Sequence, residues 1–429
     1  MSFDYFRLHP TLNANLKGLR FINPTPIQKQ AIPHVMAHKD VLGLAQTGTG
    51  KTAAFGLPIL HRLISGPRNK IRALVIAPTR ELAEQIHEAF GAMGKGTGLR
   101  SATVYGGVGM HKQVNNLRGR CEIVVACPGR LLDHMDRRNA DFSKLEILVL
   151  DEADQMFDMG FIPDVRKILR KIPDRRQTLL FAATMPPDIR KLTHECLREP
   201  VTVQVDHTKP LATVSHALYP VNQHLKAVLL LEILKRTATG SVLVFTRTKH
   251  RAKALDKKLN NAGFVAASLQ GNLSQSRRKV VMDGFRSGKF DILVATDIAS
   301  RGIDVSEISH VINYDIPSTP DTYVHRIGRT GRAAKTGDAY TLITREDEEM
   351  IRLIEKRMGR NIERRRIESF DYNQAGAPNP QGRGRHHKHH RHGQKPHRQD
   401  EKPHSKSRHS PQPGGHRNFN RSGSHHRRY

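Results

Sequence analysis

The segment VLGLAQTGTGKT, residues 41–52, carries the clearest structural signal in the sequence. Its first five residues are apolar, which predicts a buried strand, and the other seven form a glycine-rich loop that closes on Gly-Lys-Thr. Gly48 and Gly50 let backbone N–H groups approach phosphate oxygens, and Lys51 reaches the β- and γ-phosphates. Thr52, at the start of the next helix, is placed to ligate Mg²⁺. The pattern predicts a nucleotide-phosphate site, although Ala45 stands where its first glycine is usual.

A group of carboxylates follows another apolar strand. The run ILVL, residues 147–150, precedes Asp151, Glu152 and Asp154, and carboxylates this close together need a compensating cation. In proteins with a phosphate loop, an aspartate at the end of a second strand holds the Mg²⁺ of the nucleotide, which assigns the metal to Asp151. Glu152 is then placed to orient or deprotonate the attacking water. The alternative is an acidic helix start whose side chains only cap backbone N–H groups.

Short apolar strands alternate with helix-like segments along both halves of the chain. Such alternation predicts parallel sheets with helices on both faces. A single sheet holding all of these strands would be unusually wide, so we expect two α/β domains. The expected strands cover residues 41–45, 73–77, 122–126, 146–151 and 178–183 in the first half, and 241–246, 291–296, 310–315 and 339–343 in the second.

Composition sets the boundaries between the expected parts. A polar stretch with two prolines predicts a linker over residues 206–220, between a first domain at 1–205 and a second domain at 221–370. Residues 371–429 are poor in apolar side chains and, from residue 373 onward, contain thirteen Lys and Arg against two acidic residues. This segment cannot bury enough surface to fold alone, so we expect a disordered basic tail. Its histidines suggest metal binding or, more simply, a solvated polycation.

The chain as a whole is strongly basic. Its 429 residues carry a formal charge of +30, which predicts a polyanionic partner, and the tail holds too few of the 70 Lys and Arg to account for it. No apolar run is long enough to span a bilayer, and the N-terminus lacks a signal-peptide pattern. Cys121, Cys127 and Cys196 are too scattered for disulfides or a zinc site. We therefore expect a cytoplasmic protein without a membrane partner.

The phosphate loop and the sequence DEAD at 151–154 together resemble a DEAD-box RNA helicase. The family's other motifs follow in order, and the resemblance implies two tandem RecA-like domains that bind ATP, Mg²⁺ and RNA. FINPTPIQ, residues 21–28, resembles the motif that reads adenine, with Gln28 hydrogen-bonded to the base and Phe3 stacked on it. The nucleotide contacts implied in the first domain are Phe3, Phe21, Gln28, Ala45, Gln46, Thr47, Gly48, Thr49, Gly50, Lys51 and Thr52.

Other motifs of the first half resemble the family's RNA-binding segments. PTRELA at 78–83, GG at 106–107 and CPGR at 127–130 imply contacts to the RNA backbone. AAT at 182–184 resembles the motif that couples ATP hydrolysis to strand separation. The implied RNA-binding residues are Pro78, Thr79, Arg80, Gly107, Pro128, Gly129 and Arg130, and the implied coupling residues are Ala182 and Thr184.

The second half continues the resemblance with motifs that touch both ligands. VFTRT at 244–248 and QGNLSQSRR at 270–278 resemble the first motifs of the family's second domain. ATDIASRGIDV, which begins at residue 295, implies that Thr296 meets an RNA phosphate. The same motif implies nucleotide contacts from Gly302 and Asp304, with Asp304 at the ribose.

HRIGRTGR, residues 325–332, resembles the family's arginine-finger motif and implies that Arg329 and Arg332 stabilise charge on the γ-phosphate. A second α/β domain without its own Gly-Lys-Thr loop has no evident use for a nucleotide, except to supply such arginines to the first. The alternative is a solvated basic turn. The segment LVFTRTKH, residues 243–250, and the short flank before the adenine motif resemble bacterial RhlE-type enzymes in particular.

Four positions depart from the family pattern. Ala182 replaces a serine, which removes one hydroxyl contact to the acidic motif, and Cys127 replaces a threonine before Pro-Gly-Arg. Arg20 and Gln270 replace a glycine and a histidine. None of these changes removes a catalytic group, but Ala182 bears on how tightly hydrolysis and unwinding are coupled.

The leading functional prediction is an RNA-dependent ATPase that separates short duplexes or remodels RNA–protein complexes, closing two domains around ATP and single-stranded RNA. RNA is bound through its backbone with little reading of sequence, and the wider partners would be ribosomal precursors or RNA-degradation proteins. A rival is an ATP-gated RNA clamp or annealing chaperone, which the basic tail and Ala182 would suit. A DNA translocase is a weaker third interpretation.

Overall fold

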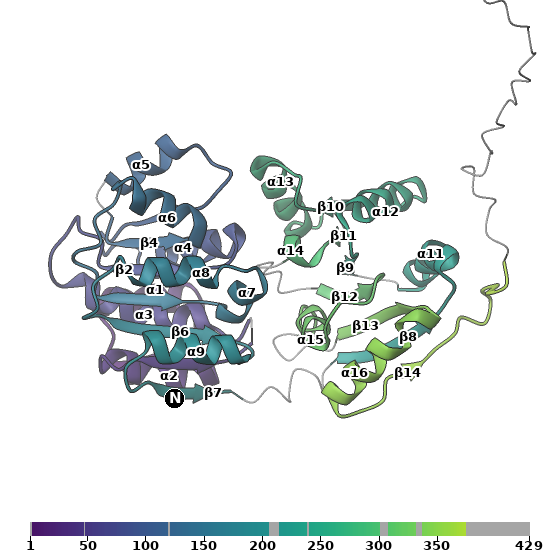
Figure 1. The fold of residues 1–429 in the computed structure, drawn as a ribbon, viewed down its shortest axis with the longest axis horizontal. Coiled ribbons are helices and arrows are strands. Elements are labelled where there is room, and N and C mark those ends of the chain that lie inside the picture. Colours follow the sequence, from purple (N-terminus) through teal and green to yellow (C-terminus); the bar gives the residue numbers. More distant parts are fainter. Residues whose placement is uncertain are drawn as a thin grey trace, which may run out of the picture. The chain divides into compact units, whose positions relative to one another are not determined.

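The computed structural model describes residues 2–46, 48–118, 121–205, 214–237, 240–300, 308–331 and 337–374. Within these residues the chain forms two sheets of 7 strands each, and every strand pair in both sheets is parallel. Helices flank the strands in each domain (Figure 1). Thr47, Gly302, Asp304 and Arg332 lie outside the described residues, as does the tail beyond residue 374.

The first domain begins with a short helical segment and two helices that lead into the sheet. Its helices are η1 (Phe3–Phe6), α1 (Pro10–Gly18), α2 (Pro26–Met36), α3 (Lys51–Ile64), α4 (Arg80–Met93), α5 (Met110–Arg118), α6 (Pro128–Asp136), α7 (Ala153–Asp158), α8 (Ile162–Leu169) and α9 (Pro187–Cys196). Its strands are β1 (Val41–Leu44), β2 (Ala73–Ile76), β3 (Ser101–Val104), β4 (Ile123–Ala126), β5 (Ile147–Leu150), β6 (Gln177–Ala182) and β7 (Val201–Gln204).

The strand order of the first sheet is β3-β4-β2-β5-β6-β1-β7. Strands β2, β4, β5 and β6 are buried along their whole length, as expected for β-branched runs covered on both faces by helices. Strands β1, β5 and β6 are neighbours although far apart in sequence. Their carboxyl ends therefore bring the phosphate loop, the carboxylates and residues 183–184 to one edge, where ligands of open parallel sheets bind.

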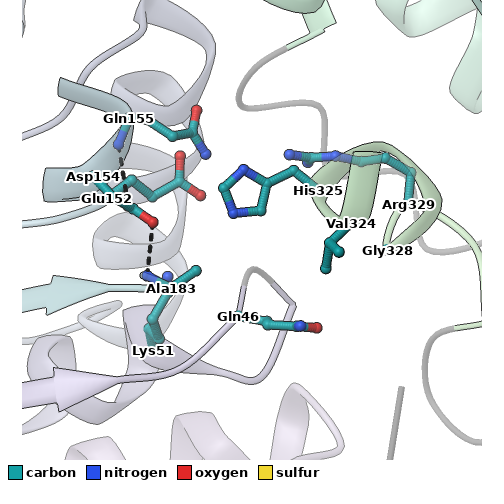
Figure 2. Close-up of a pocket in the computed structure, with 10 residues that line it drawn as sticks. All are labelled: Gln46, Lys51, Glu152, Asp154, Gln155, Ala183, Val324, His325, Gly328 and Arg329. Atoms are coloured by element: carbon teal, nitrogen blue, oxygen red, sulfur yellow. Dashed lines mark hydrogen bonds between the residues drawn. The ribbon is translucent and has the colours of Figure 1, made fainter. Parts of the chain in front are cut away.

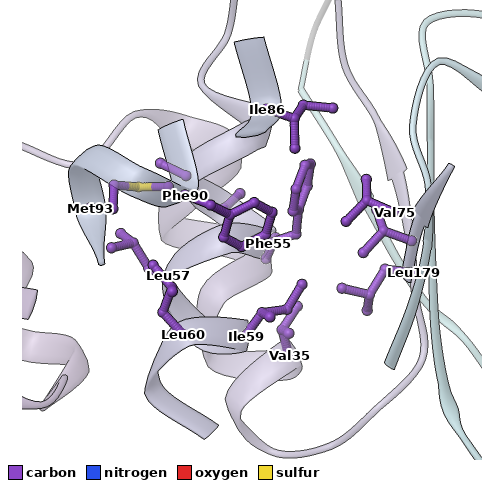
Figure 3. Close-up of a cluster of buried hydrophobic side chains, with 14 of the residues drawn as sticks. Val35, Phe55, Leu57, Ile59, Leu60, Val75, Ile86, Phe90, Met93 and Leu179 are labelled. Atoms are coloured by element: carbon purple, nitrogen blue, oxygen red, sulfur yellow. The ribbon is translucent and has the colours of Figure 1, made fainter. Parts of the chain in front are cut away.

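Helix α3 is anchored by aromatic packing, which fixes the position of the phosphate loop. Phe55 is fully buried, and its ring centroid lies 5.6 Å from that of Phe181 and 6.3 Å from that of Phe90. These rings belong to a larger apolar cluster between the helices and one face of the sheet (Figure 3). A Cβ at Gly43 would collide with the Phe181 ring, so strand β1 needs glycine there.

The second domain repeats this architecture. Its helices are η2 (Gln223–Leu225), α11 (Lys226–Arg236), α12 (Lys249–Asn261), α13 (Gln275–Arg286), α14 (Asp297–Ser300), α15 (Pro320–Ile327), η3 (Arg345–Asp347) and α16 (Glu348–Met358). Its strands are β8 (Val214–Pro220), β9 (Ser241–Phe245), β10 (Ala266–Leu269), β11 (Ile292–Ala295), β12 (Ile308–Asn313), β13 (Gly337–Ile343) and β14 (Glu363–Arg364). The order β10-β11-β9-β12-β13-β8-β14 matches that of the first sheet strand for strand.

Two boundaries drawn from composition are wrong at the residue level. Residues 214–220, which we placed in the linker, form strand β8 and pair with β13 and β14. Proline is compatible with this strand because Pro220 is its last residue. Tyr372, which we placed in the tail, packs on Phe370 and its hydroxyl accepts a hydrogen bond from the Ile367 N–H at 3.0 Å. The described part of 371–374 thus adjoins the second domain.

The three cysteines are buried and unpaired, as expected from their number and spacing. Among the residues that the structure describes, no helix is both long and apolar enough to cross a membrane.

Candidate active site

The phosphate loop turns sharply between strand β1 and helix α3. Gly48 and Gly50 have φ angles of 83° and 94°, a region that side-chain-bearing residues rarely adopt. Lys51 is the first residue of α3, and its Nζ donates to the Ala45 carbonyl at 3.1 Å. It also lies 4.0 Å from Asp151 Oδ1. The buried Lys51 ammonium therefore has one backbone hydrogen bond and one long ion pair, which leaves it available to bind a phosphate.

The carboxylates after strand β5 are buried and under strain. Asp151 and Glu152 are each 2% exposed, and Glu152 adopts a left-handed conformation at φ 52°. Burial raises the pKa of Asp151, and burial followed by the Asp151 charge raises the pKa of Glu152 to about 7, while Lys51 and Arg329 act in the opposite direction. Two adjacent carboxylates that resist ionisation in this way are suited to receive a cation.

One carboxylate oxygen of this group has no hydrogen-bond partner in the described part of the chain. Within the described residues, Glu152 Oε2 is buried and makes no hydrogen bond. No cluster of three or more His, Cys, Asp or Glu side chains among those residues is arranged to hold a metal by itself. Mg²⁺ is usually held by one or two carboxylates together with substrate phosphates, so Asp151 and the Thr52 hydroxyl fit the ion that accompanies a nucleotide.

Asp154 links the carboxylate segment to the end of strand β6. Its Oδ2 accepts hydrogen bonds from the Ala183 N–H at 3.0 Å, the Thr184 N–H at 2.9 Å and the Thr184 hydroxyl at 3.2 Å. Ala182 is fully buried, and its carbonyl accepts from the Ala45 N–H at 3.0 Å. Residues 182–184 therefore touch both the phosphate loop and the acidic motif, and the Ala182 side chain takes no part in either contact.

A pocket gathers these groups with residues of helix α15. The first domain lines it with Gln46, Lys51, Glu152, Asp154, Gln155 and Ala183, and the second domain with Val324, His325, Gly328 and Arg329. His325 lies in α15 and Arg329 in the turn that follows it, and both point toward the side of the carboxylates (Figure 2). Burial lowers the pKa of His325 and keeps the imidazole neutral. A lysine, a carboxylate and an arginine thus surround one small polar space.

The residues expected at adenine are arranged next to the phosphate loop. Gln28 is buried, its Oε1 accepts from the Thr25 N–H at 2.9 Å, and its Nε2 donates to the Gly50 carbonyl at 3.1 Å. Each end of the amide keeps a further hydrogen-bonding position, so these contacts leave it able to pair with a base. Phe3 is buried with its ring 6.0 Å from Phe21, edge to face.

The residues expected at RNA follow the carboxyl ends of β2, β3 and β4. Pro78 and Thr79 are buried, and the Thr79 hydroxyl caps helix α4. The Arg80 guanidinium lies against Gly107, whose φ is 82° and where a Cβ would collide with Arg80 Nη1. Arg130 Nη1 donates to the Val108 carbonyl at 2.9 Å. Two arginines therefore converge on the turn at 105–109.

The other expected RNA contacts lie at helix starts. Pro128 and Gly129 begin α6, where backbone N–H groups lack partners within the helix. Thr296 is partly buried and directly follows strand β11, in the second domain.

Comparison with known proteins identifies the family. The family models of the DEAD/DEAH box helicases and of the helicase conserved C-terminal domain match residues 25–192 and 225–334. The DEAD-box ATP-dependent RNA helicase CshA of Bacillus licheniformis is 41% identical over 372 residues, which cover 86% of this chain and 76% of that protein. CshA of Bacillus subtilis is also 41% identical, over 86% of this chain and 75% of its own. This chain belongs to the DEAD-box family of ATP-dependent RNA helicases.

Solved structures of DEAD-box helicases share the fold. Dbp5 of S. cerevisiae, bound to RNA and ADP BeF3, has a TM-score of 0.77 and 32% identity, covering 85% of this chain and 95% of that one. A shortened Mss116p bound to single-stranded RNA and AMP-PNP has a TM-score of 0.78 and 27% identity, covering 85% and 79%. The two RecA-like domains expected from the sequence are confirmed.

The helicase site also contains residues that sequence reasoning did not assign. His325 and Gln155 line the pocket, and Asp154 carries the contact to Thr184. The signal for His325 was present, because it opens the motif HRIGRTGR, but the arginines alone were given a role. Arg326, in the same motif, is 2% exposed and binds Asp297 and the carbonyl of Asp315 within its own domain.

Proposed function

We propose that this helicase binds ATP at residues 45–52, with the adenine near Phe3, Phe21 and Gln28, and hydrolyses it with groups from both domains. The observation that carries the proposal is the pocket in which Lys51, Glu152 and Arg329 meet. Single-stranded RNA would lie along Arg80, Gly107 and Arg130, with Thr296 as a contact from the second domain, and the bound backbone would be read without regard to sequence.

The chemistry follows from the charges around the pocket. A water oxygen forms a bond to the γ-phosphorus as the bond to the bridging oxygen breaks, and Glu152 accepts the proton of the water. Its raised pKa suits this role, because a base works best with a pKa near the operating pH. Lys51 and Arg329, with Arg332 as the second expected finger, neutralise charge on the phosphates. Asp151 and Thr52 would hold Mg²⁺, which would supply further positive charge to the phosphates.

Coupling to RNA is proposed to run through Asp154 and Thr184. Three hydrogen bonds already join Asp154 to residues 183–184, two of which come from backbone N–H groups. This link does not need a hydroxyl at residue 182. The presence of alanine at that position therefore does not favour a clamp or annealing function over unwinding.

The finer assignments are also proposals. The RhlE-type subfamily rests on residues 243–250, whereas the relatives named above are CshA enzymes, which makes CshA-type the competing assignment. A cytoplasmic location is supported by three unpaired cysteines. Ribosomal precursors and RNA-degradation proteins are the proposed wider partners, and the basic charge of the chain suits RNA-rich complexes.

The proposal is tested with Glu152→Gln. This variant should still bind ATP and RNA, because Lys51, Asp151 and the RNA-binding residues are untouched, while turnover with RNA falls by about 10²-fold or more. ATP binding and RNA-saturated turnover are measured on the same preparation. Turnover within a few-fold of the parent protein would remove Glu152 from the mechanism.

A further inference from the structure

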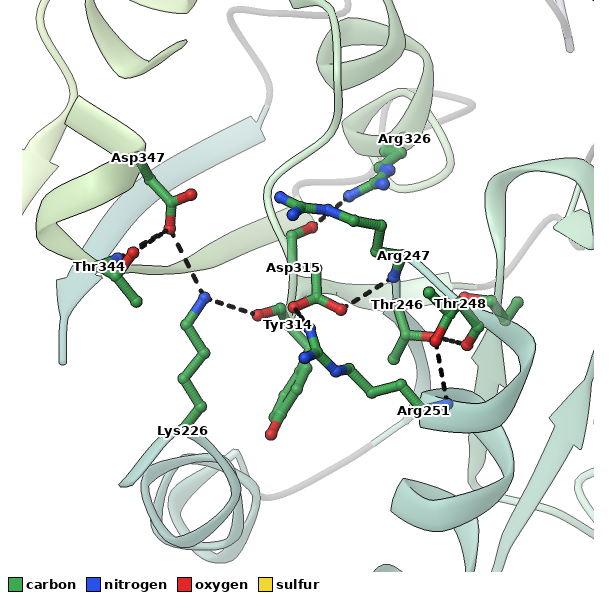
Figure 4. Close-up of polar contacts among 11 residues, drawn as sticks. Lys226, Thr246, Arg247, Thr248, Arg251, Tyr314, Asp315, Arg326, Thr344 and Asp347 are labelled. Carbon is green, nitrogen blue, oxygen red and sulfur yellow. Dashed lines mark hydrogen bonds and ion pairs between the residues drawn. The ribbon is translucent and has the colours of Figure 1, made fainter. Parts of the chain in front are cut away.

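Asp315 lies at the carboxyl edge of the second sheet and holds several elements together. It follows strand β12, is 3% exposed, and its N–H donates to the Phe245 carbonyl at 3.2 Å. Its carboxylate accepts from the Arg247 N–H at 2.9 Å through Oδ2 and from Arg251 Nη1 at 2.5 Å through Oδ1 (Figure 4). One buried carboxylate thus fixes both the end of β9 and the first turn of α12.

The carbonyl of the same residue fixes helix α15. Arg326 Nη1 donates to the Asp315 carbonyl at 2.7 Å, and the guanidinium also binds Asp297 at 2.6 Å and 2.8 Å. It stacks over the Phe245 ring at 4.9 Å from the centroid. Arg326 lies in α15, which ends at Ile327, and precedes Arg329 by three residues, so the turn that carries Arg329 directly follows this anchor.

On its other side Asp315 holds the backbone N–H of Arg247 and the guanidinium of Arg251, two residues whose side chains are exposed to solvent. Arg247 is exposed, and Arg251 is 40% exposed although it is paired with Asp315. The Thr248 hydroxyl accepts from the Arg251 N–H and caps helix α12, whose first residue, Lys249, adds a further positive charge. An exposed, held cluster of basic side chains at a helix start is suited to an RNA phosphate.

We propose that Asp315 is a positioning residue that couples RNA binding to ATP hydrolysis. It holds the backbone of Arg247 and the guanidinium of Arg251 at a surface where both arginines contact an RNA phosphate, and through the Arg326 anchor it holds helix α15 and the turn after it, from which Arg329 reaches the nucleotide. A displacement of Arg247 and Arg251 on binding RNA is thereby transmitted to Arg329, and a displacement of Arg329 is transmitted to them. The inference rests on the proposed role of Arg329.

The second sheet offers a matched control at the same edge. Asp347 is 12% exposed and lies 3.7 Å from Lys226 Nζ, which is 2% exposed. Its Oδ2 also accepts from the Thr344 N–H and hydroxyl, both at 2.9 Å. This ion pair is buried much as Asp315 is, and the contacts of Asp347 do not include Arg247, Arg251 or Arg326, although its partner Lys226 also donates to the Tyr314 carbonyl at 3.2 Å. Loss of Asp347 therefore measures the cost of a broken buried pair alone.

The experiment compares Asp315→Ala, Asp315→Asn and Asp347→Ala in the full chain. For Asp315→Ala we expect KM for a single-stranded RNA to rise about tenfold and RNA-saturated kcat to fall about tenfold, since small misplacements of binding and catalytic groups have effects of this order. ATP affinity without RNA should stay within twofold. Asp315→Asn should recover part of both losses, because its side-chain oxygen still accepts from the Arg247 N–H. Asp347→Ala should lower the melting temperature without raising KM for RNA.

The possible results separate a positioning role from a purely structural one. If Asp315→Ala and Asp347→Ala change the melting temperature and the RNA parameters alike, Asp315 is only structural and the inference is overturned. The inference is also overturned if Asp315→Asn, which keeps the fold more easily, binds RNA and turns over as the parent does. Arg329→Ala is measured in parallel. Normal turnover of Arg329→Ala would overturn the proposed active site. Reduced turnover of Arg329→Ala together with normal Asp315 variants would overturn this inference alone.

Discussion

The two sheets have the same strand order, but their carboxyl edges are used differently. Lys51 begins α3 after β1, and Lys226 begins α11 after the corresponding strand β8. Asp151 follows β5, and Asp315 follows its counterpart β12. At the first edge the lysine lies 4.0 Å from Asp151, next to a carboxylate oxygen of Glu152 that has no hydrogen-bond partner among the described residues. At the second edge, Lys226 binds the Tyr314 carbonyl and Asp347, and Asp315 binds the Arg251 guanidinium and the Arg247 backbone N–H.

This difference shows how one fold serves two purposes. The first edge keeps charges incompletely compensated, which costs stability and, in the proposed mechanism, provides the attraction for a nucleotide and its metal. The second edge satisfies the equivalent lysine and aspartate internally and so is rigid enough to carry cations for another site. In the proposed mechanism the active site is divided between a copy that binds ATP and a copy that presents arginines.

The largest expected effect separates the two lysines. Lys51→Met should abolish measurable ATP binding or reduce turnover by about 10³-fold or more, because the phosphates lose their closest cation. Lys226→Met should leave ATP affinity within twofold and instead lower the melting temperature, because Asp347 loses its buried partner. Nucleotide binding by calorimetry and thermal melts test both. Loss of ATP binding in Lys226→Met would show that Lys226 contributes to the nucleotide site.

A smaller effect concerns RNA at the first edge. A Cβ at Gly107 would collide with Arg80, so Gly107→Ala should displace that guanidinium and weaken RNA binding by about tenfold while ATP affinity stays unchanged. The control is Gly109→Ala, because no atom lies within 4 Å of its Cβ. RNA titrations at several salt concentrations measure the effect. Equal RNA affinity in the two variants would remove Arg80 from the RNA surface.

The buried carboxylates of the first edge predict a dependence of stability on pH. The pKa of Glu152 is raised on folding to about 7, so the folded protein holds more protons than the unfolded chain above the ordinary value of 4.5. Stability therefore falls as pH rises through this window, and the loss is complete above the raised pKa. Glu152→Gln cannot ionise and should melt at a higher temperature than the parent, by a margin that grows from pH 5 to pH 8. A margin independent of pH would mean that Glu152 does not titrate in this range.

The smallest effect is expected at residue 182. Ala182→Ser restores the family hydroxyl, but Asp154 Oδ2 already receives three hydrogen bonds, so the ratio of strands separated to ATP hydrolysed should change by less than about twofold. Unwinding and ATPase assays on the same duplex give this ratio. A severalfold rise would mean that the coupling link is incomplete in the natural sequence.

Much of the fold was predictable because its signals are local. Each expected strand is present within about two residues, since buried parallel strands are continuous apolar runs. The strands that were missed are the edge strands β3, β7, β10 and β14, together with β8. Edge strands such as β7 alternate in burial and carry polar residues, so composition does not mark them.

The residues of the candidate site could be predicted from the sequence, whereas many of the contacts between residues could not. The phosphate loop, Asp151 and Glu152 could be assigned from spacing, because phosphate and Mg²⁺ chemistry restrict the residue types. The contacts of Asp315 with Arg247, Arg251 and Arg326 could not, because they join residues between 11 and 68 positions apart. Such contacts depend on strand order, which the sequence pattern alone leaves open.

The division of the active site is tested most directly by Arg329→Ala. RNA-saturated turnover should fall by about 10³-fold, while ATP affinity in the absence of RNA should change by less than twofold, because the arginine acts on the reacting phosphate from the second domain. Arg329→Lys, which keeps the charge without the planar guanidinium, should recover only part of the loss. Turnover of Arg329→Ala within a few-fold of the parent would contradict an active site shared between the two domains.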